Sequence, residues 1–472
     1  MGDNDRIKSP DNGLIVQSPS SSYKPRTVAS GVKGPLYMQS SDGRHVLVRR
    51  SKRKEDGSWK HFTRWFVRKQ ISLSANLLAL LFLCHSLIPK ARSHTQKYFQ
   101  LAYFNAKSGE YGIGCEDVYF LSFCIVLFTL LRAGFMEYIL SPFAKMQGVT
   151  KKKDQVRFTE QAWLLVYYSV FWTMGMYIYC KSPYYLNMRA IWTDWPHREV
   201  DGLMKGYVLA QWAFWLQQII VINIEERRKD HWQMFSHHII TTLLISSCYC
   251  YRLTRVGNVI LVIMDVVDLF LPAAKCLKYA GYNAICDAMF VVFMLSWLIA
   301  RHILYIMVCW SVYAHTSEVI PFGCFTGSDD HLIGPEAPPS GMMWMVEPFI
   351  SSTGRLCHTE LVKWCFLAPL LLLQGITIYW FTMILRVALK VIRGDGAEDS
   401  RSDHESVEEE DEYVYEEAEP LEQEVDADEI DLRSWERRTG VRRQASSSGV
   451  SLPGHSDRKE LLGRIGCEKQ VD

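Results

Sequence analysis

Four side chains in the middle of the sequence have types and spacings that suit acid–base or nucleophilic chemistry. His237 and His238 are adjacent, and Asp265 and Asp268 follow in the next apolar segment, three positions apart. Imidazole titrates near neutral pH and can act as a base or a nucleophile, while a carboxylate can orient it and stabilise its cation. We therefore predict that these four residues form one catalytic site.

The two aspartates lie within an apolar segment that is long enough to cross a membrane. A carboxylate at this depth costs about 2.5 to 3.5 kcal/mol, so the pair costs about 5 to 7 kcal/mol unless it finds partners. The i, i+3 spacing places Asp265 and Asp268 on one helix face. A two-residue turn at Thr254 and Arg255 makes the two segments antiparallel neighbours, so histidines and aspartates can meet across a hairpin.

Adjacent residues point about 100° apart on a helix, so we expect one histidine to face the site and the other to support it. A single membrane histidine is often only an interhelical hydrogen-bond donor, and this remains the alternative for His237 or His238 taken alone. Arg301 and His302 also lie inside an apolar segment, and their roles stay open.

Metal binding is another use for these residues, and the number of ligands argues against it. His231, His237 and His238 form one cluster, without the further histidine boxes that membrane di-iron hydroxylases and desaturases need. We therefore predict no metal and no bound cofactor.

Membrane helices must position these residues. A bilayer core requires about 20 mostly apolar residues per helix, because no water is present to satisfy exposed backbone groups. Eight segments of the 472-residue chain qualify, namely 71–89, 118–140, 162–180, 206–224, 235–253, 256–278, 285–313 and 364–392. Several contain no Asp, Glu, Lys or Arg, whereas a soluble helix has a polar stripe. We predict an all-α polytopic membrane protein with about eight transmembrane helices.

The distribution of charge predicts the orientation of these spans. The net charge of +1 conceals an acidic tail, because residues 394–432 hold 19 acidic residues and one arginine. Lys and Arg collect in the N-terminal arm and around 145–157, 227–229, 275–278 and 386–393. With eight spans these regions share one side, which the positive-inside rule makes cytosolic, although Lys90, Arg92 and Lys97 then face the lumen. We predict cytosolic termini, disordered arms and no nucleic-acid partner.

Two smaller predictions concern covalent chemistry. Cys324 and Cys357 share one lumenal loop and could form a disulfide in an oxidising compartment. In the tail, Ser402 and Ser406 are followed by acidic residues that suit an acid-directed kinase, and Ser446 follows RRQA, which suits a base-directed one. A solvated tail without these modifications is the alternative.

Residues 158–393 resemble the TLC domain of ceramide synthases. The motif that carries the resemblance occupies residues 227–275, with a charged RKD start, the HH pair, then D-x-x-D followed by small residues and a lysine. Val267 stands where the family usually has Ser, and Pro272 interrupts the stretch of small residues, which puts fine substrate preference in doubt. The acidic tail and the long N-terminal arm resemble the fungal branch.

The resemblance implies an acyltransferase of the endoplasmic reticulum membrane, with a helix bundle that encloses a lipid cavity. It implies transfer of a fatty acyl group from acyl-CoA to the amine of dihydrosphingosine or phytosphingosine, with His237 or His238 as base or acyl carrier and Asp265 and Asp268 in support. Further implied features are contact with membrane lipids, a small single-pass regulatory subunit, a homo- or hetero-dimer, a very-long-chain preference and acyl selection by the loop 314–363.

The predicted organisation has four parts. A basic arm (1–70) precedes two transmembrane helices (71–140), a TLC domain of six helices (158–393) and an acidic tail (394–472). The alternative function is that of a non-catalytic TLC-type protein that senses or transfers lipid. Such a protein would not need both the HH pair and the D-x-x-D motif.

Overall fold

The computed structural model describes residues 36–39, 45–48, 58–224, 230–328 and 331–393. The chain divides into two units, and the described part of the first is an antiparallel hairpin of β1 (Leu36–Gln39) and β2 (His45–Val48). The acidic tail with Ser402, Ser406 and Ser446, and the basic residues 227–229, lie outside the described residues.

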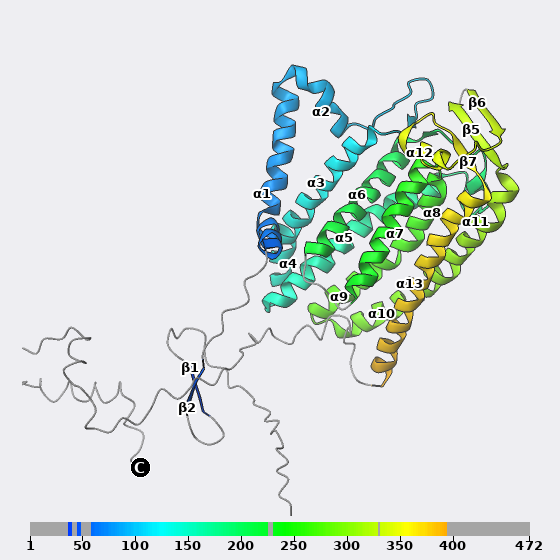
Figure 1. Ribbon diagram of the computed structural model, residues 1–472. Coiled ribbons are helices and arrows are strands. Elements are labelled where there is room, and N and C mark those ends of the chain that lie inside the picture. Colours follow the sequence, from blue (N-terminus) through cyan, green and yellow to red (C-terminus); the bar gives the residue numbers. More distant parts are fainter. Residues whose placement is uncertain (1–35, 40–44, 49–57, 225–229, 329–330, 394–472) are drawn as a thin grey trace, which may run out of the picture. The chain divides into compact units, whose positions relative to one another are not determined.

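The second unit is a bundle of long helices (Figure 1). Its α-helices are α1 (Ser58–Leu87), α2 (Arg92–Phe99), α3 (Asp117–Gly134), α4 (Ser141–Met146), α5 (Lys152–Lys181), α6 (Gly202–Ile224), α7 (His231–Cys250), α8 (Thr254–Asp265), α9 (Val267–Tyr279), α10 (Asn283–Trp297), α11 (Tyr305–Val319), α12 (Glu347–Ile350) and α13 (Glu360–Ile392). Two π-helical segments, η2 (Phe135–Leu140) and η4 (Leu298–Leu304), continue α3 and α10. The short 3₁₀ turns are η1 (Pro89–Ala91), η3 (Ala190–Trp192) and η5 (Met343–Met345).

Helices occupy all eight apolar segments predicted from the sequence. Among the described residues, five helical stretches are long and apolar enough to cross a bilayer, namely His61–Leu87, Asp117–Met146, Gly202–Ile224, Asn283–Val319 and Glu360–Lys390. The prediction of an all-α membrane protein is therefore confirmed, while the count of eight crossings stays a prediction.

Several helix boundaries differ from the sequence-based expectation. The predicted span 256–278 is divided at Val266 into α8 and α9, so Asp265 and Asp268 lie on different helices. Helix α1 begins at Ser58, so the last part of the predicted arm 1–70 is helical. The turn between α7 and α8 precedes Thr254 and Arg255, which form the first turn of α8. Arg252 closes α7 in the left-handed backbone region, at φ 58°, and its guanidinium donates to the carbonyls of Ile113 and Ser352, both at 3.0 Å. These tertiary hydrogen bonds outweigh the preference of non-glycine residues for negative φ.

The bundle has two distinct ends (Figure 1). The start of α1 and the end of α13 lie at one end, called here the terminal end. The opposite end, called the cap end, carries β5 (Gly323–Ser328), β6 (His331–Glu336) and β7 (Leu356–His358), which form an antiparallel sheet in the order β6-β5-β7. A second pair, β3 (Tyr111–Gly112) with β4 (Glu199–Val200), links the segments before α3 and α6.

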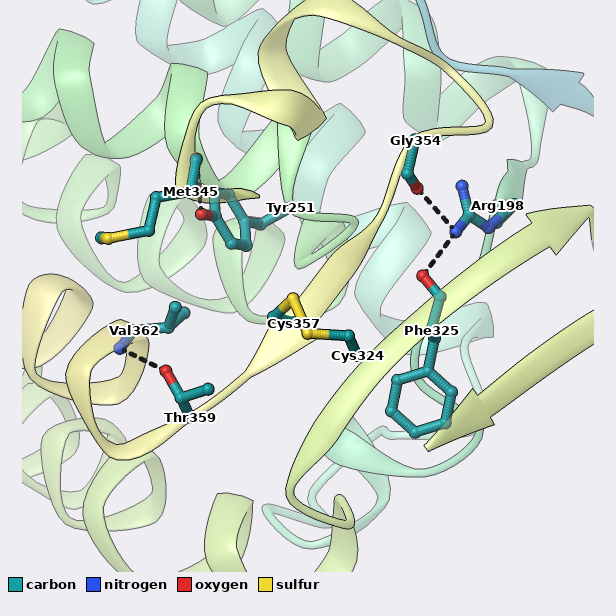
Figure 2. Close-up of a disulfide and its surroundings, with 9 residues drawn as sticks. All are labelled: Arg198, Tyr251, Cys324, Phe325, Met345, Gly354, Cys357, Thr359 and Val362. Carbon is teal, nitrogen blue, oxygen red and sulfur yellow. Dashed lines mark hydrogen bonds between the residues drawn. A yellow bond between two sulfur atoms is a disulfide. The ribbon is translucent and has the colours of Figure 1, made fainter. Parts of the chain in front are cut away.

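A disulfide between Cys324 and Cys357 joins β5 to β7 in the cap (Figure 2). Arg198 donates hydrogen bonds to the carbonyls of Phe325 and Gly354, at 3.1 and 2.9 Å. The backbone N–H of Val362 donates to the Thr359 hydroxyl at 3.3 Å, which caps the start of α13. The structure thus contains the Cys324–Cys357 disulfide, which the sequence had left as a possibility.

A buried ion pair ties three helices together near the cap end. Lys205, at the start of α6, lies 2.6 Å from the carboxylate of Asp117 on α3, and both side chains are buried. The same ammonium donates to the carbonyls of Ala102 and Gly112, and the Tyr249 hydroxyl of α7 donates to Asp117 at 2.7 Å. These hydrogen bonds offset the desolvation cost of the two charges. The sequence analysis began the fourth span at position 206 and missed this pair.

Aromatic packing orients α6 within the bundle. The ring of Phe214 on α6 stacks on Tyr167 of α5, with ring centroids 3.4 Å apart, and Phe128 of α3 meets both rings edge-on. With α6 held in this rotation, Gln211 bonds to α8 and Trp215 contacts α7. The rotation of α6 beside the site is therefore fixed by aromatic side chains of α3 and α5.

Candidate active site

The histidine pair lies near the start of α7, between two tryptophans. The indole of Trp215 meets the rings of His237 and His238 edge-on, at centroid distances of 5.4 and 5.1 Å, and Trp380 of α13 meets His237 at 5.2 Å. The Nδ1 atom of His237 is buried without a hydrogen-bond partner among the described residues. The two indoles thus hold the imidazole rings by ring contacts, without hydrogen bonds to the imidazole nitrogen atoms.

Asp265 ends α8 and is almost completely buried, with 1% of its surface exposed. Its Oδ2 accepts a hydrogen bond of 2.7 Å from the Gln211 side chain, and the Tyr167 hydroxyl donates to Gln211 at 2.8 Å. A chain from α5 through α6 therefore holds this carboxylate in place.

Asp268 lies in the first turn of α9 and pairs with Arg301. The guanidinium donates to Asp268 Oδ2 at 2.8 Å and to the Met264 carbonyl at 3.1 Å, and it lies over the Trp297 ring at 4.1 Å. Arg301 belongs to the π-helical segment η4, and such wide turns occur frequently at functional sites.

The expectation that histidines and aspartates meet directly across the hairpin needs correction. Among the described residues, neither aspartate is hydrogen-bonded to His237 or His238; instead Gln211 and Arg301 are their partners. The physical reason is that a carboxylate in an apolar interior needs the strongest available donor, and α6 and η4 supply an amide and a guanidinium. Of the four predicted residues, His237, Asp265 and Asp268 line one cavity, and His237, His238 and Asp268 line a second.

Two cavities meet at His237. An apolar cavity extends along α7, α8 and α13 from Asp265 and Asp268 to His358 at the cap end. A more polar cavity contains His231, His238 and Lys275 among its lining residues. Four side chains line both cavities: Trp215, His237, Asp268 and Arg301. His237 therefore faces the junction, whereas His238 lines only the polar cavity.

The arrangement suits a reaction in which an apolar group in one cavity meets a polar group in the other. An imidazole at the junction can accept a proton or attack a carbonyl, and the carboxylates beside it can attract a cation. No cluster of three or more His, Cys, Asp or Glu side chains is placed to hold a metal within the described parts of the chain.

Several residues of the site escaped the sequence analysis. Gln211, Trp215 and Trp380 belong to spans without a recognised motif, and Arg301 was noticed without a partner. A glutamine inside a charge-free span was the available signal, because an amide in a bilayer must find a partner.

Comparison with known proteins identifies the family. The family model of the TLC domain, named for TRAM, LAG1 and CLN8, matches residues 157–386. The ceramide synthase FUM18 of Gibberella moniliformis is 45% identical over 338 residues, which cover 72% of this chain and 79% of that protein. The chain belongs to the ceramide synthase family. Its members include the sphingosine N-acyltransferase-like protein ALT7 of Alternaria alternata, 44% identical over 73% of this chain and 77% of that protein.

Ceramide synthase relatives extend to other fungi. The sphingosine N-acyltransferase lag1 of Schizosaccharomyces pombe is 38% identical, over 73% of this chain and 80% of that protein. All four predicted site residues fall inside the matched TLC domain. The resemblance to fungal ceramide synthases is thereby confirmed.

Proposed function

We propose that this protein is a ceramide synthase that transfers a fatty acyl group from acyl-CoA to the amine of a sphingoid base, dihydrosphingosine or phytosphingosine. One observation carries the proposal: His237 lies where an apolar cavity meets a polar one. The apolar cavity suits the acyl chain, and the polar cavity suits the amine and the CoA. Relatives named as ceramide synthases and sphingosine N-acyltransferases support this assignment.

His237 acts on the reacting atoms in one of two ways. It takes the proton of the ammonium so that the free amine attacks the thioester, or it attacks first and forms an acyl-histidine that the amine resolves. In both routes a C–N bond forms, the C–S bond breaks and CoA leaves as the thiol. His238, on the polar side only, supports His237.

The aspartates act on substrate charge rather than through a direct hydrogen bond to imidazole. Asp268 lines both cavities, so it attracts the ammonium of the sphingoid base to the junction. Its ion pair with Arg301 fixes the carboxylate. Asp265, held by Gln211, lines the apolar cavity together with His237 and Asp268.

The length of the apolar cavity sets a scale for the acyl chain. Its wall on α7 runs from His237 to Tyr251, which is about 21 Å at 1.5 Å per residue. An all-trans chain advances about 1.25 Å per carbon, given C–C bonds of about 1.52 Å at about 111°, so about 17 carbons fit. A very long chain continues among the cap residues Trp195, Cys357 and His358, which line the same cavity. Exclusion of water along this wall protects the thioester from hydrolysis.

We place the protein in the endoplasmic reticulum membrane with both termini cytosolic. Helix α1 begins and α13 ends at the terminal end of the bundle, where α4 and α9 also lie. The basic residues Lys145, Lys275 and Arg386 belong to α4, α9 and the C-terminal part of α13. The disulfide lies in the cap, at the opposite end, which suits an oxidising lumen. A small single-pass subunit and a homo- or hetero-dimer remain proposals from the family resemblance.

The test is amide formation in microsomes that contain the protein, a sphingoid base and a panel of acyl-CoAs, with products measured by mass spectrometry. We expect His237→Ala and His238→Ala, and to a smaller degree Asp265→Ala and Asp268→Ala, to lower turnover at equal expression. Near-normal turnover in both histidine variants would refute the site. Binding of lipid without any amide product would favour the lipid-sensing or lipid-transfer alternative.

A further inference from the structure

A threonine beside His237 has a hydroxyl group with no hydrogen-bond partner. Thr241 lines the apolar cavity, only 9% of its surface is exposed, and its Oγ1 is unpartnered among the described residues. Helical threonines usually donate to a carbonyl three or four residues earlier. Thr129 and Thr173 do so here, at 2.8 and 2.7 Å. Thr241 departs from this pattern, so a buried hydroxyl with an unfilled hydrogen bond lies in the wall of the cavity.

The position of Thr241 relative to His237 places that hydroxyl on the acyl side of the junction. The two residues are four apart on α7, a spacing that brings side-chain β-carbons to about 5 to 6 Å on one helix face. Both line the apolar cavity, and α7 continues along it through Ile245 and Cys248. An acyl group whose C1 lies at His237 and whose tail follows α7 therefore passes Thr241 first.

Other donors near the junction have different surroundings. The Arg301 guanidinium is held by Asp268 and the Met264 carbonyl. The indole nitrogen of Trp215 is buried and has no partner among the described residues, so it is the rival donor. Trp215 lines both cavities and meets His237 and His238 edge-on, whereas Thr241 lines only the apolar one.

We propose that the Thr241 hydroxyl donates a hydrogen bond to the carbonyl oxygen of the acyl group and stabilises the oxyanion formed during transfer. When a nitrogen attacks C1, the π electron pair of the carbonyl moves to oxygen, and it returns as the C–S bond breaks and CoA leaves. The threonine keeps its proton throughout. This assignment rests on the proposed acyltransferase function and makes Thr241 a catalytic residue of that reaction.

A donor at this position has a large effect because the surroundings are apolar. A fixed hydrogen-bond donor stabilises a developing negative charge more strongly in a water-poor site than in water, and it does not have to reorient during the reaction. A hydroxyl also stays neutral over the working pH range, so it adds no charge to the cavity.

The chain supplies a matched control for the test. Thr242 is the next residue, it is equally buried at 9% exposure, and its Oγ1 also has no partner among the described residues, but it does not line the apolar cavity. Thr241→Val and Thr242→Val thus remove the same hydroxyl group from neighbouring positions with nearly unchanged shape. Thr241→Ser retains the hydroxyl and serves as the conservative rescue.

The assay measures kcat and KM for amide formation with one acyl-CoA and one sphingoid base. We expect Thr241→Val to lower kcat about 100-fold with little change in KM, as for loss of one oxyanion donor. Thr241→Ser keeps most of the activity, and Thr242→Val matches the unmodified protein. The pH profile of Thr241→Val keeps its shape, because no titrating group is lost. If Thr241→Val does not accumulate, Thr241→Ala removes the same hydroxyl.

Three results overturn the proposal. Equal kcat in Thr241→Val and Thr242→Val excludes a special role for Thr241. A loss in Thr241→Ser as large as in Thr241→Val, with a raised KM, indicates packing rather than hydrogen bonding. A large loss of kcat in Trp215→Phe alone assigns the donor to the indole. Absence of amide product in the unmodified protein with every acyl-CoA instead refutes the proposed function itself.

Discussion

Filling the apolar cavity at different depths is expected to shorten the acyl chain that the protein accepts. Ile245 and Cys248 both line this cavity on α7, at increasing distance from His237. Substitution of either by Trp places a large ring across the path of the chain. Chains that end before the ring remain substrates, and longer chains do not.

The helix geometry gives the magnitudes. From His237 to Ile245 the helix rises about 12 Å, and from His237 to Cys248 about 16.5 Å, at 1.5 Å per residue. At about 1.25 Å per extended carbon, Ile245→Trp limits the chain to about 10 carbons and Cys248→Trp to about 13, against about 17 at the level of Tyr251. We thus expect a specific maximum acyl-chain length for each variant, and a shorter maximum for Ile245→Trp than for Cys248→Trp.

The assay uses an equimolar mixture of acyl-CoAs of graded length with one sphingoid base, and mass spectrometry reports the product distribution. Leu243→Trp is the control, because Leu243 lies on the same helix but is 60% exposed and does not line the cavity. Overpacking costs about 1 to 3 kcal/mol of stability, so retained activity with the shortest chains verifies that each variant is folded.

The reasoning fails if Ile245→Trp keeps the product distribution of the unmodified protein while its activity persists. It also fails if Leu243→Trp shortens the products as strongly as Ile245→Trp does. Either result would mean that the acyl chain lies outside this cavity.

Three further predictions concern stability and the cap. Lys205→Met leaves the buried Asp117 carboxylate without its cation and is expected to lower the free energy of unfolding by about 3 to 5 kcal/mol. Thermal unfolding in detergent measures this loss. Recovery of stability in a double variant that also carries Asp117→Leu verifies that the unpaired carboxylate is the cause. Burial lowers the pKa of His358, so the folded state binds the proton less readily than the unfolded state. The free energy of unfolding should therefore fall as the pH drops below about 6.5. The melting temperature should differ less between pH 7.5 and pH 5.5 in His358→Phe than in the unmodified protein. The disulfide closes a loop with a sequence separation of 33, and replacing Cys324 and Cys357 by Ser is expected to cost about 3.5 kcal/mol; intact mass with and without reductant verifies the bond, and an unchanged melting temperature in the double variant would contradict this estimate.

The membrane fold was predictable, and a candidate site could be proposed, because the signals for both are local in the chain. Runs of apolar residues predict helices, and helices occupy all eight segments. The adjacent histidines and the spacing of Asp265 and Asp268 drew attention to α7 and to the junction of α8 with α9, and both aspartates and His237 line one cavity. The shared loop of Cys324 and Cys357 made their pairing possible to propose.

The partners of these residues could not be predicted, because they depend on helix rotation and neighbour order. Gln211 reaches Asp265 across 54 positions of sequence, and Arg301 reaches Asp268 across 33. A polar side chain in a membrane helix must find some partner, but the local pattern does not specify which one. The sequence allowed a direct contact between histidine and aspartate if the helices were suitably rotated, and among the described residues the aspartates bond to Gln211 and Arg301 instead.

By itself, the sequence determined which segments are helical, that two carboxylates lie three positions apart in an apolar segment, and which family the chain resembles. Only the tertiary structure decided that His237 lines two cavities while His238 lines one, and that the Thr241 hydroxyl is buried without a partner among the described residues. The physical reason is that hydrophobicity and spacing act along one helix, whereas a cavity is formed by the side chains that several helices leave unpacked between them.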